Sequence, residues 1–245
     1  MALPALIQSA IDAHGGRARW EPLEAIDATL SAWGFLFTAK RRPVLRHVRV
    51  HASTREPHLV FHDLPRAGER SEWRGHDEVR VVGPDGSVLA RREHPRQAFA
   101  GVRRQLYWDH LDFVYFAGYA TWNYLVTPFL FLREGFSFES MPPLQTPAGE
   151  WSRIRANFPA DVPTHSRTQN FYFDERHLLR RLDYTAEVVG PWAHAAHLCE
   201  QLQEFDGLMV PSHRTVKPLL LGSRPLPFPT LVGIDVHDLR ARVAR

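Results

Sequence analysis

Apolar and polar residues alternate along much of the chain, which is the pattern of half-buried β-strands. In the first third, the segment 27–37 places Trp33, Phe35 and Phe37 on one face of an expected strand. The turn-forming sequence Pro84-Asp85-Gly86 stands between two apolar runs, which is typical of a hairpin. We therefore predict antiparallel sheet in this third, with further strands at 45–52, 58–63, 70–74 and 78–82.

The last third of the chain returns to the same alternation. A hairpin turn is expected at Asp174–His177, and the segment 193–205 is ambiguous because its alanine, leucine, glutamate and glutamine residues favour a helix. The segment 140–149, which contains three prolines, is predicted to be a loop or linker. The predicted strands of this third lie at 150–158, 165–174, 178–188, 207–217 and 230–237.

The middle of the chain is strongly apolar. The segment 113–132 contains no charged residue and has about the length of a membrane span. Gly118, Asn123 and Pro128 interrupt it, and its aromatic residues are spread throughout instead of lying at its ends. We therefore predict a buried helix over 113–127 and an extended piece after it, with a membrane segment as the alternative.

Helical spacing is otherwise clear only at 3–14, a segment that Gly15-Gly16 should end. Many short strands with few helices indicate an α+β fold. The 245 residues, 44% hydrophobic and 23% charged, have the composition of an ordinary globular protein. We predict a single domain over 1–245, with an antiparallel sheet of roughly eight to eleven strands.

The charge distribution argues against a nucleic-acid partner. The formal net charge is only +3, and acidic residues are interleaved among the arginines almost everywhere, whereas nucleic-acid-binding proteins concentrate positive charge. The single cysteine, Cys199, excludes an internal disulfide. The N-terminal sequence around Asp12 lacks the basic region of a secretory signal, so we expect a cytoplasmic protein with no integral membrane segment.

No motif predicts a cofactor or a metal. The sequence has no glycine-rich phosphate loop, no nucleophile elbow and no CxxC pair. Its fourteen histidines lack the local spacing that zinc sites usually show. We therefore expect neither a nucleotide cofactor nor a metal site.

Polar residues form a stripe along the predicted central helix. Asp112, Tyr115, Tyr119 and Asn123 follow helical spacing and so share one face, with Trp122 beside them. Burying such a stripe against hydrocarbon is costly, so it should meet polar partners or face a pocket. A structural network between helix and sheet and a pocket lining both remain open at this point.

The predicted sheet offers matching partners for this stripe. Strand alternation places His165 and Gln169 on one face, and the turn after that strand brings Asp183 onto its neighbour. If 193–205 is a strand, His197 could join them on the concave side, although the same face could equally be the solvated one. If chemistry occurs there, His165 or His197 would shuttle a proton, with Asp183 or Asp112 as the orienting carboxylate.

Two stretches carry a resemblance to a known family. They are Ala13-His14-Gly15-Gly16 with Trp20, and the order of elements from FPADVPTHSRTQNFYFD to LVGIDVHDLR. Together they resemble the LolA/LolB lipoprotein-carrier fold, which the cofactor-independent enzyme VioE shares. The resemblance implies a strongly curved antiparallel sheet, or half-barrel, whose hollow is plugged by a helix at 107–127. It also implies that 193–205 is a strand and that the fold encloses a lipophilic cavity.

These observations favour a soluble protein that binds a hydrophobic or aromatic small molecule in a half-barrel cavity. The expected lining is Tyr115, Tyr119, Trp122, Asn123 and Gln169. The alternative is a cofactor-independent lyase, isomerase or hydrolase that uses histidine, aspartate and tyrosine in acid–base chemistry on such a molecule. A structural or interaction protein is the third possibility, and the sequence does not indicate an oligomeric state.

Overall fold

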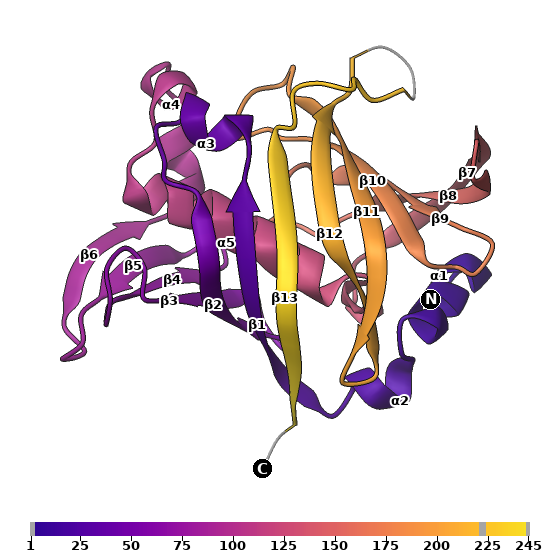
Figure 1. Cartoon of the computed structure of the whole chain (residues 1–245), viewed down its shortest axis with the longest axis horizontal. Helices are drawn as coiled ribbons and strands as arrows, with labels where there is room; N and C mark the ends of the chain where they lie inside the picture. The colour runs from indigo at the N-terminus through magenta and orange to yellow at the C-terminus, as the bar shows by residue number, and fades with distance from the viewer. Residues whose placement is uncertain (1–2, 221–223, 244–245) are drawn as a thin grey trace.

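One antiparallel sheet organises the molecule. The computed structural model describes residues 3–220 and 224–243. Within these residues the sheet has 13 strands in the order β6-β5-β4-β3-β2-β1-β13-β12-β11-β10-β9-β8-β7, so the last strand of the chain pairs with the first (Figure 1). The strands are β1 Leu23–Trp33, β2 Leu45–Ser53, β3 His58–His62, β4 Arg70–Arg74, β5 Glu78–Val82, β6 Val88–Glu93, β7 Ser137–Thr146, β8 Gly149–Asn157, β9 Thr168–Phe173, β10 Leu179–Thr185, β11 His194–Phe205, β12 Leu208–Pro218 and β13 Val232–Val243.

The sheet curves around one long helix. Helix α5, His110–Val126, crosses the hollow behind β1, β2 and β13 (Figure 1). This arrangement is an α+β half-barrel with β6 and β7 at its two edges, so the fold class predicted from the strand pattern and the curved sheet implied by the resemblance are confirmed. The prediction of roughly eight to eleven strands was too low for a sheet of 13. The shorter elements are α1 Ala5–Ala13, α2 Arg17–Trp20, α3 Phe35–Ala39, α4 Arg103–Leu106, and the 3₁₀ turns η1 Pro95–Phe99 and η2 Phe129–Leu132.

Helix α5 packs tightly against the strands of the first third. A Cβ atom added at Gly118 would lie 2.5 Å from the Cβ of Trp73 on β4, so only glycine lets the helix approach this closely. The ring of Trp73 in turn packs on Trp122 of the helix, with 5.8 Å between ring centroids. Among the described residues, no helix is long and apolar enough to cross a membrane.

The Ala13-His14-Gly15-Gly16 motif holds α1 against the sheet. His14 Nδ1 lies 2.7 Å from the carbonyl oxygen of Ala10, and the backbone N–H of Leu179 donates to Nε2 at 3.3 Å. Gly15 has a φ of +126°, and an added Cβ would come within 2.4 Å of the carbonyl oxygen of Gly207. The motif that carried the family resemblance therefore has a structural role, because it packs α1 against β10 and the β11–β12 turn.

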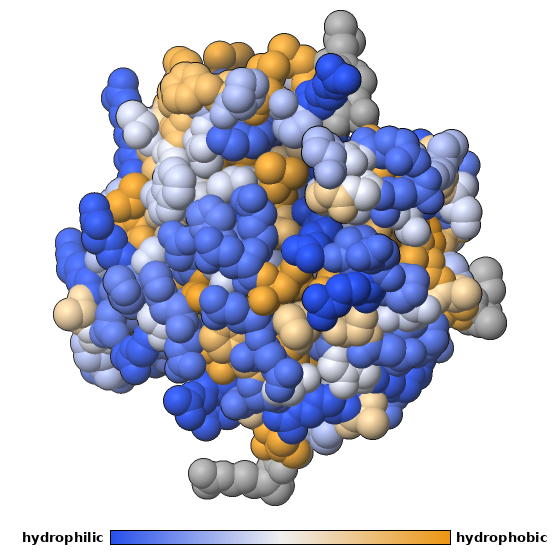
Figure 2. Space-filling model, turned by 45° about the vertical axis from the view of Figure 1, so that its right-hand side comes forward, coloured by the Kyte–Doolittle hydropathy of each residue, from blue (hydrophilic) through white to orange (hydrophobic). Residues whose placement is uncertain are grey.

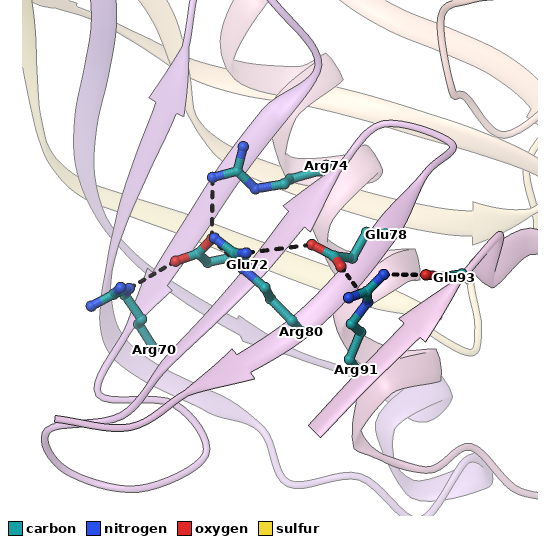
Figure 3. A network of polar contacts seen from close by, with 7 residues as sticks. All are labelled: Arg70, Glu72, Arg74, Glu78, Arg80, Arg91 and Glu93. Atoms are coloured by element: carbon teal, nitrogen blue, oxygen red, sulfur yellow. Dashed lines mark hydrogen bonds and ion pairs between the residues drawn. The ribbon is translucent and has the colours of Figure 1, made fainter. Parts of the chain in front are cut away.

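An ion-pair network covers the face of β4–β6 that is turned away from α5 (Figure 3). Glu72 accepts hydrogen bonds from Arg70 at 2.7 Å and from Arg80 at 2.6 Å, and Arg74 lies 3.4 Å away. Burial alone would raise the pKa of Glu72, but the hydrogen bonds from these arginines outweigh it and lower the pKa. Many arginines interleaved with acidic residues thus form ion pairs across neighbouring strands.

Two predicted segments differ from the structure near the first strand and the central helix. Trp33 ends β1, Gly34 turns the backbone with a φ of 129°, and Phe35 begins α3, so the strand prediction over 27–37 was wrong beyond Trp33. Phe37 is buried as part of α3, and this burial stabilises the helix more than the alternating pattern favours a strand. The residues after Pro128 form the 3₁₀ turn η2 and not an extended piece.

In the second half of the chain, one prediction was wrong, and the structure decides one segment that the sequence left ambiguous. The segment 140–149, expected to be a loop, belongs mostly to edge strand β7, whose register shifts between Met141 and Leu144. Prolines are tolerated at such a shift on an edge strand, because one side of that strand needs no ladder hydrogen bonds. The ambiguous segment 193–205 is strand β11, as the resemblance implied and against its helix propensity.

Candidate functional site

An apolar cavity lies between α5 and the central strands of the sheet. Its volume is about 330 Å³, at the lower end of the range typical of small-molecule sites. Helix α3 and the 186–193 connection contribute further walls. The residues that line it from the sheet are Ala32, Leu45, Tyr184, His194, Ala195, Val216, Pro218, Val232 and Ile234.

The helix face that lines this cavity is not the polar stripe that the sequence singled out. Residues at helical spacing along α5, with small side chains in the middle, form its wall: Phe113, Phe116, Ala117, Ala120, Thr121 and Tyr124. Ala117 and Ala120 leave the space that larger side chains would fill. Of the nine site residues predicted from sequence, the cavity lining includes only His165.

His165 lies at the centre of a buried tyrosine cluster in the cavity wall. It precedes β9 instead of lying within it, and its side chain reaches α5. Its Nδ1 lies 3.1 Å from the hydroxyl oxygen of Tyr119, and its Nε2 lies 2.6 Å from that of Tyr124. Its ring stacks on Tyr184 with 4.0 Å between centroids, and the Tyr124 and Tyr184 hydroxyls are 3.0 Å apart. A neutral imidazole with one donor and one acceptor nitrogen satisfies this arrangement.

Burial keeps this cluster uncharged near neutral pH. Desolvation, with a further contribution from Arg96, lowers the pKa of His165 to about 3. Desolvation also raises the pKa of the Tyr124 hydroxyl well above its ordinary value, and raises that of Tyr184. The cavity wall can therefore offer hydrogen bonds from neutral groups, while a titrating acid or base near pH 7 is absent from this cluster.

His197 and Cys199 share a face of β11, behind the tyrosines. His197 is fully buried, and its ring meets Tyr124 edge-on at 4.4 Å between centroids. Arg214 of β12 donates to Cys199 Sγ at 3.2 Å and to the carbonyl oxygen of Tyr124 at 2.9 Å. Desolvation and the positive charge of Arg214 lower the pKa of His197 well below its ordinary value. The group joins helix to sheet but does not line the cavity.

The two predicted carboxylates lie away from both histidines. Asp183 is paired with Arg181 at 2.6 Å and accepts a hydrogen bond from Tyr172 at 2.7 Å. It alternates along β10 with Tyr184, which faces the cavity, so Asp183 points to the opposite face of the sheet. Asp112 forms the N-terminal capping box of α5 and lies 2.5 Å from Arg92. Both carboxylates therefore have structural partners.

The remaining predicted residues form the structural network that the sequence left open. Tyr115 packs between the rings of Phe99 and Tyr119, and Trp122 donates to the carbonyl oxygen of Ser53 at 2.8 Å. Asn123 donates to the carbonyl oxygens of Tyr119 and Pro163, and Gln169 donates to the hydroxyl of Thr164 at 2.6 Å. These contacts tie α5 to η1, to the end of β2 and, through Asn123, to the loop before β9.

The cavity opens at the end of the molecule where α3 and the β12–β13 connection lie. Phe35, Trp192 and Leu220 line it while remaining 54%, 69% and 65% exposed. Apolar surface gathers at this end in the space-filling view (top of Figure 2). Large apolar side chains exposed together around an opening are typical of a ligand or interaction site. No part of the described chain forms a group of three or more metal-ligating side chains.

Sequence reasoning missed most of this lining for identifiable reasons. The spacing of Phe113, Ala117, Ala120 and Tyr124 is visible in the sequence, but the stripe of polar residues on the other face of α5 is the stronger signal for a site. Ala117 and Ala120 could have indicated the cavity, because small residues at helical spacing within an aromatic helix leave room beside the helix. The contribution of α3 and of Trp192 depends on loop conformations that periodicity does not report.

Comparisons with known proteins agree with this architecture. No family model matches the sequence, and a search of curated proteins finds no match. Three solved structures are similar over nearly the whole chain. A LolA superfamily protein from Nitrosomonas europaea has a TM-score of 0.55 at 11% identity, covering 100% of this chain and 96% of its own.

The other two structures are similar to the same degree. A domain described as an outer membrane lipoprotein-sorting protein, from Vibrio parahaemolyticus, has a TM-score of 0.54 at 11% identity, with 96% of this chain and 90% of its own covered. A DUF1329 family protein from Desulfovibrio piger has a TM-score of 0.53 at 13% identity, covering 98% and 93%. At such identities the similarity establishes architecture alone. The chain therefore has a LolA-like fold.

Proposed function

We propose that this protein binds a lipophilic small molecule, aliphatic or aromatic, in the cavity between α5 and the sheet. The observation that supports this proposal most strongly is the cavity itself: about 330 Å³ of space with walls of aliphatic and aromatic side chains. Transfer of an apolar ligand from water into such a site is favourable by roughly 25 cal/mol per Å² of apolar surface buried. The exposed Phe35, Trp192 and Leu220 at the opening would contact a ligand as it enters.

The enzyme alternative has weaker support from the geometry. His165 does lie within hydrogen-bond distance of Tyr124, another titratable group in the cavity wall. Yet both of its ring nitrogens face tyrosine hydroxyls, and its lowered pKa makes it a weak base at neutral pH. Neither Asp112 nor Asp183, the predicted orienting carboxylates, has His165 among its hydrogen-bond partners. Binding is therefore the function that we propose.

Fluorescence of N-phenyl-1-naphthylamine, an uncharged apolar probe, tests the proposal. The wild-type chain should bind the probe saturably, while Ala120→Leu should weaken binding at least about tenfold because the new side chain projects into the cavity. Ala5→Leu is the matched control, since it makes the same change on an exposed position of α1. Thermal unfolding of each variant reports whether it folds.

Two results would count against binding in this cavity. One is the absence of saturable probe binding by the folded wild-type chain. The other is equal affinity of the wild type and Ala120→Leu, which would place the probe elsewhere on the molecule.

A further inference from the structure

Two basic side chains lie in the otherwise apolar wall of the cavity. Lys40 follows α3 as its C-terminal cap, and Arg42 lies two residues further along the connection to β2. Both line the cavity, and the backbone N–H of Arg42 is fixed by a 2.8 Å hydrogen bond to the carbonyl oxygen of Phe37. The connection thus holds two cationic groups at one wall of the proposed ligand site.

The described lining of the cavity contains no aspartate and no glutamate. Lys40 is only 4% exposed, donates a hydrogen bond to the carbonyl oxygen of Gln105, and lies over the ring of Trp108 with Nζ 5.2 Å from the ring centroid. Desolvation by the surrounding side chains lowers the pKa of its amine. A buried cation is stabilised strongly by a nearby anion, because the low local dielectric strengthens the attraction.

The guanidinium of Arg42 retains hydrogen-bonding capacity. Its centre lies 5.7 Å from the ring centroid of Phe113, and Nη2 lies 3.3 Å from His110 Nδ1. Its Nε is buried and has no hydrogen-bond partner. A buried donor without a partner is destabilising, because it has lost its hydrogen bond to water and gained none in return. The Nε and Nη donors of one guanidinium form the planar fork that binds two oxygens of a carboxylate or phosphate.

We propose that the ligand is an anionic amphiphile, whose carboxylate or phosphate head group binds at Arg42 and Lys40 while its apolar part fills the cavity along α5. This inference rests on the proposed function and adds the chemical class of the ligand. The anion supplies the acceptor that Arg42 Nε lacks and compensates for the charge of the Arg42 guanidinium, beside which the described lining has no carboxylate. The apolar part lies against Phe116, Ala117 and Ala120.

Displacement of N-phenyl-1-naphthylamine by ligands that share one alkyl chain tests the head group separately from the chain. Dodecanoate should displace the probe from the wild type at about tenfold lower concentration than dodecanol, because a charged hydrogen bond adds roughly that factor. Dodecyl phosphate in a parallel titration identifies which anion binds more tightly.

Variants locate the preference at the basic wall. Arg42→Gln should reduce the ratio between dodecanol and dodecanoate to near one, because it removes the charge that distinguishes the two head groups. Arg46→Gln, on an exposed position of β2 outside the cavity lining, should keep the wild-type ratio. If Arg42→Gln does not fold, Lys40→Gln tests the same wall of the cavity, and it should also lower the ratio between dodecanol and dodecanoate.

The outcomes separate this inference from the function on which it rests. Equal displacement by dodecanoate and dodecanol from the wild type, or a preference that survives in folded Arg42→Gln and Lys40→Gln, would overturn the anion site and leave apolar binding intact. Failure of every alkyl ligand and of the probe to bind would refute the proposed function itself.

Discussion

Buried histidines should make the fold sensitive to mild acid. Burial lowers the pKa of His14 and of His110 to about 4 and that of His165 to about 3, from 6.5 in the unfolded chain. The folded state keeps these rings neutral, whereas the unfolded chain binds a proton on each below pH 6.5. Their stabilising contribution is therefore fully present above pH 6.5 and is lost as the pH falls toward 4.

The size of the effect follows from the pKa differences. Lowering the pH from 7 to 5 costs about 2 kcal/mol for each ring, so three rings lower the free energy of unfolding by about 6 kcal/mol. This loss is comparable to the whole stability of many proteins, about 5–15 kcal/mol. His14 is the clearest case, because its Nε2 accepts the N–H of Leu179 and protonation would place two donors face to face.

Urea unfolding followed by tryptophan fluorescence, repeated at several pH values, measures this dependence. His14→Gln should reduce the slope of unfolding free energy against pH by about 1.2 kcal/mol per pH unit between pH 6 and 5. His237→Gln, the same substitution at a solvent-exposed position of β13, is the matched control. A stability that stays flat from pH 7 to 5 would refute the assignment of neutral buried rings.

Three other outcomes are expected. Gly118→Ala should lower the free energy of unfolding by about 1–2 kcal/mol in chemical denaturation, because the clash with Trp73 outweighs the gain in helix propensity; an unchanged or higher stability would contradict the packing of α5. Glu72→Gln should destabilise by about 1 kcal/mol at low ionic strength and less at high salt, since its arginine partners are partly exposed; the same loss at both ionic strengths would exclude an ion-pair effect. Cys199 should react with a thiol reagent only on unfolding, because burial raises the pKa of its thiol; fast reaction of the native chain would contradict its burial.

Strand alternation predicted most of the fold because it depends on local pattern. The strands from Leu45 to Val82 and the hairpin at Pro84–Gly86 follow the sequence closely, and β2 and β5 largely alternate buried with more exposed positions. The segment 193–205 shows the limit of local propensity. Its helix-favouring residues form β11 because pairing with both β10 and β12 determines their conformation.

The candidate site was harder to predict because it depends on which face of each element turns inward. Tyr119 and His165 do meet, yet the cavity lies on the neighbouring face of α5, beside Ala117 and Ala120. Asp183 is on the predicted strand, but its neighbour Tyr184 is the residue that faces the cavity, so Asp183 lies on the opposite face of the sheet. There it pairs with Arg181, two residues away on the same face. A single sequence specifies this alternation within each strand but not the direction in which the sheet curves.

A crystal structure with an ω-bromo fatty acid tests the central claim most directly. The account predicts an anomalous bromine peak inside the cavity, in contact with the α5 face that carries Ala117 and Ala120, and a carboxylate within hydrogen-bond distance of Arg42. Bromine bound only outside this cavity, with the space between α5 and the sheet empty, would contradict it.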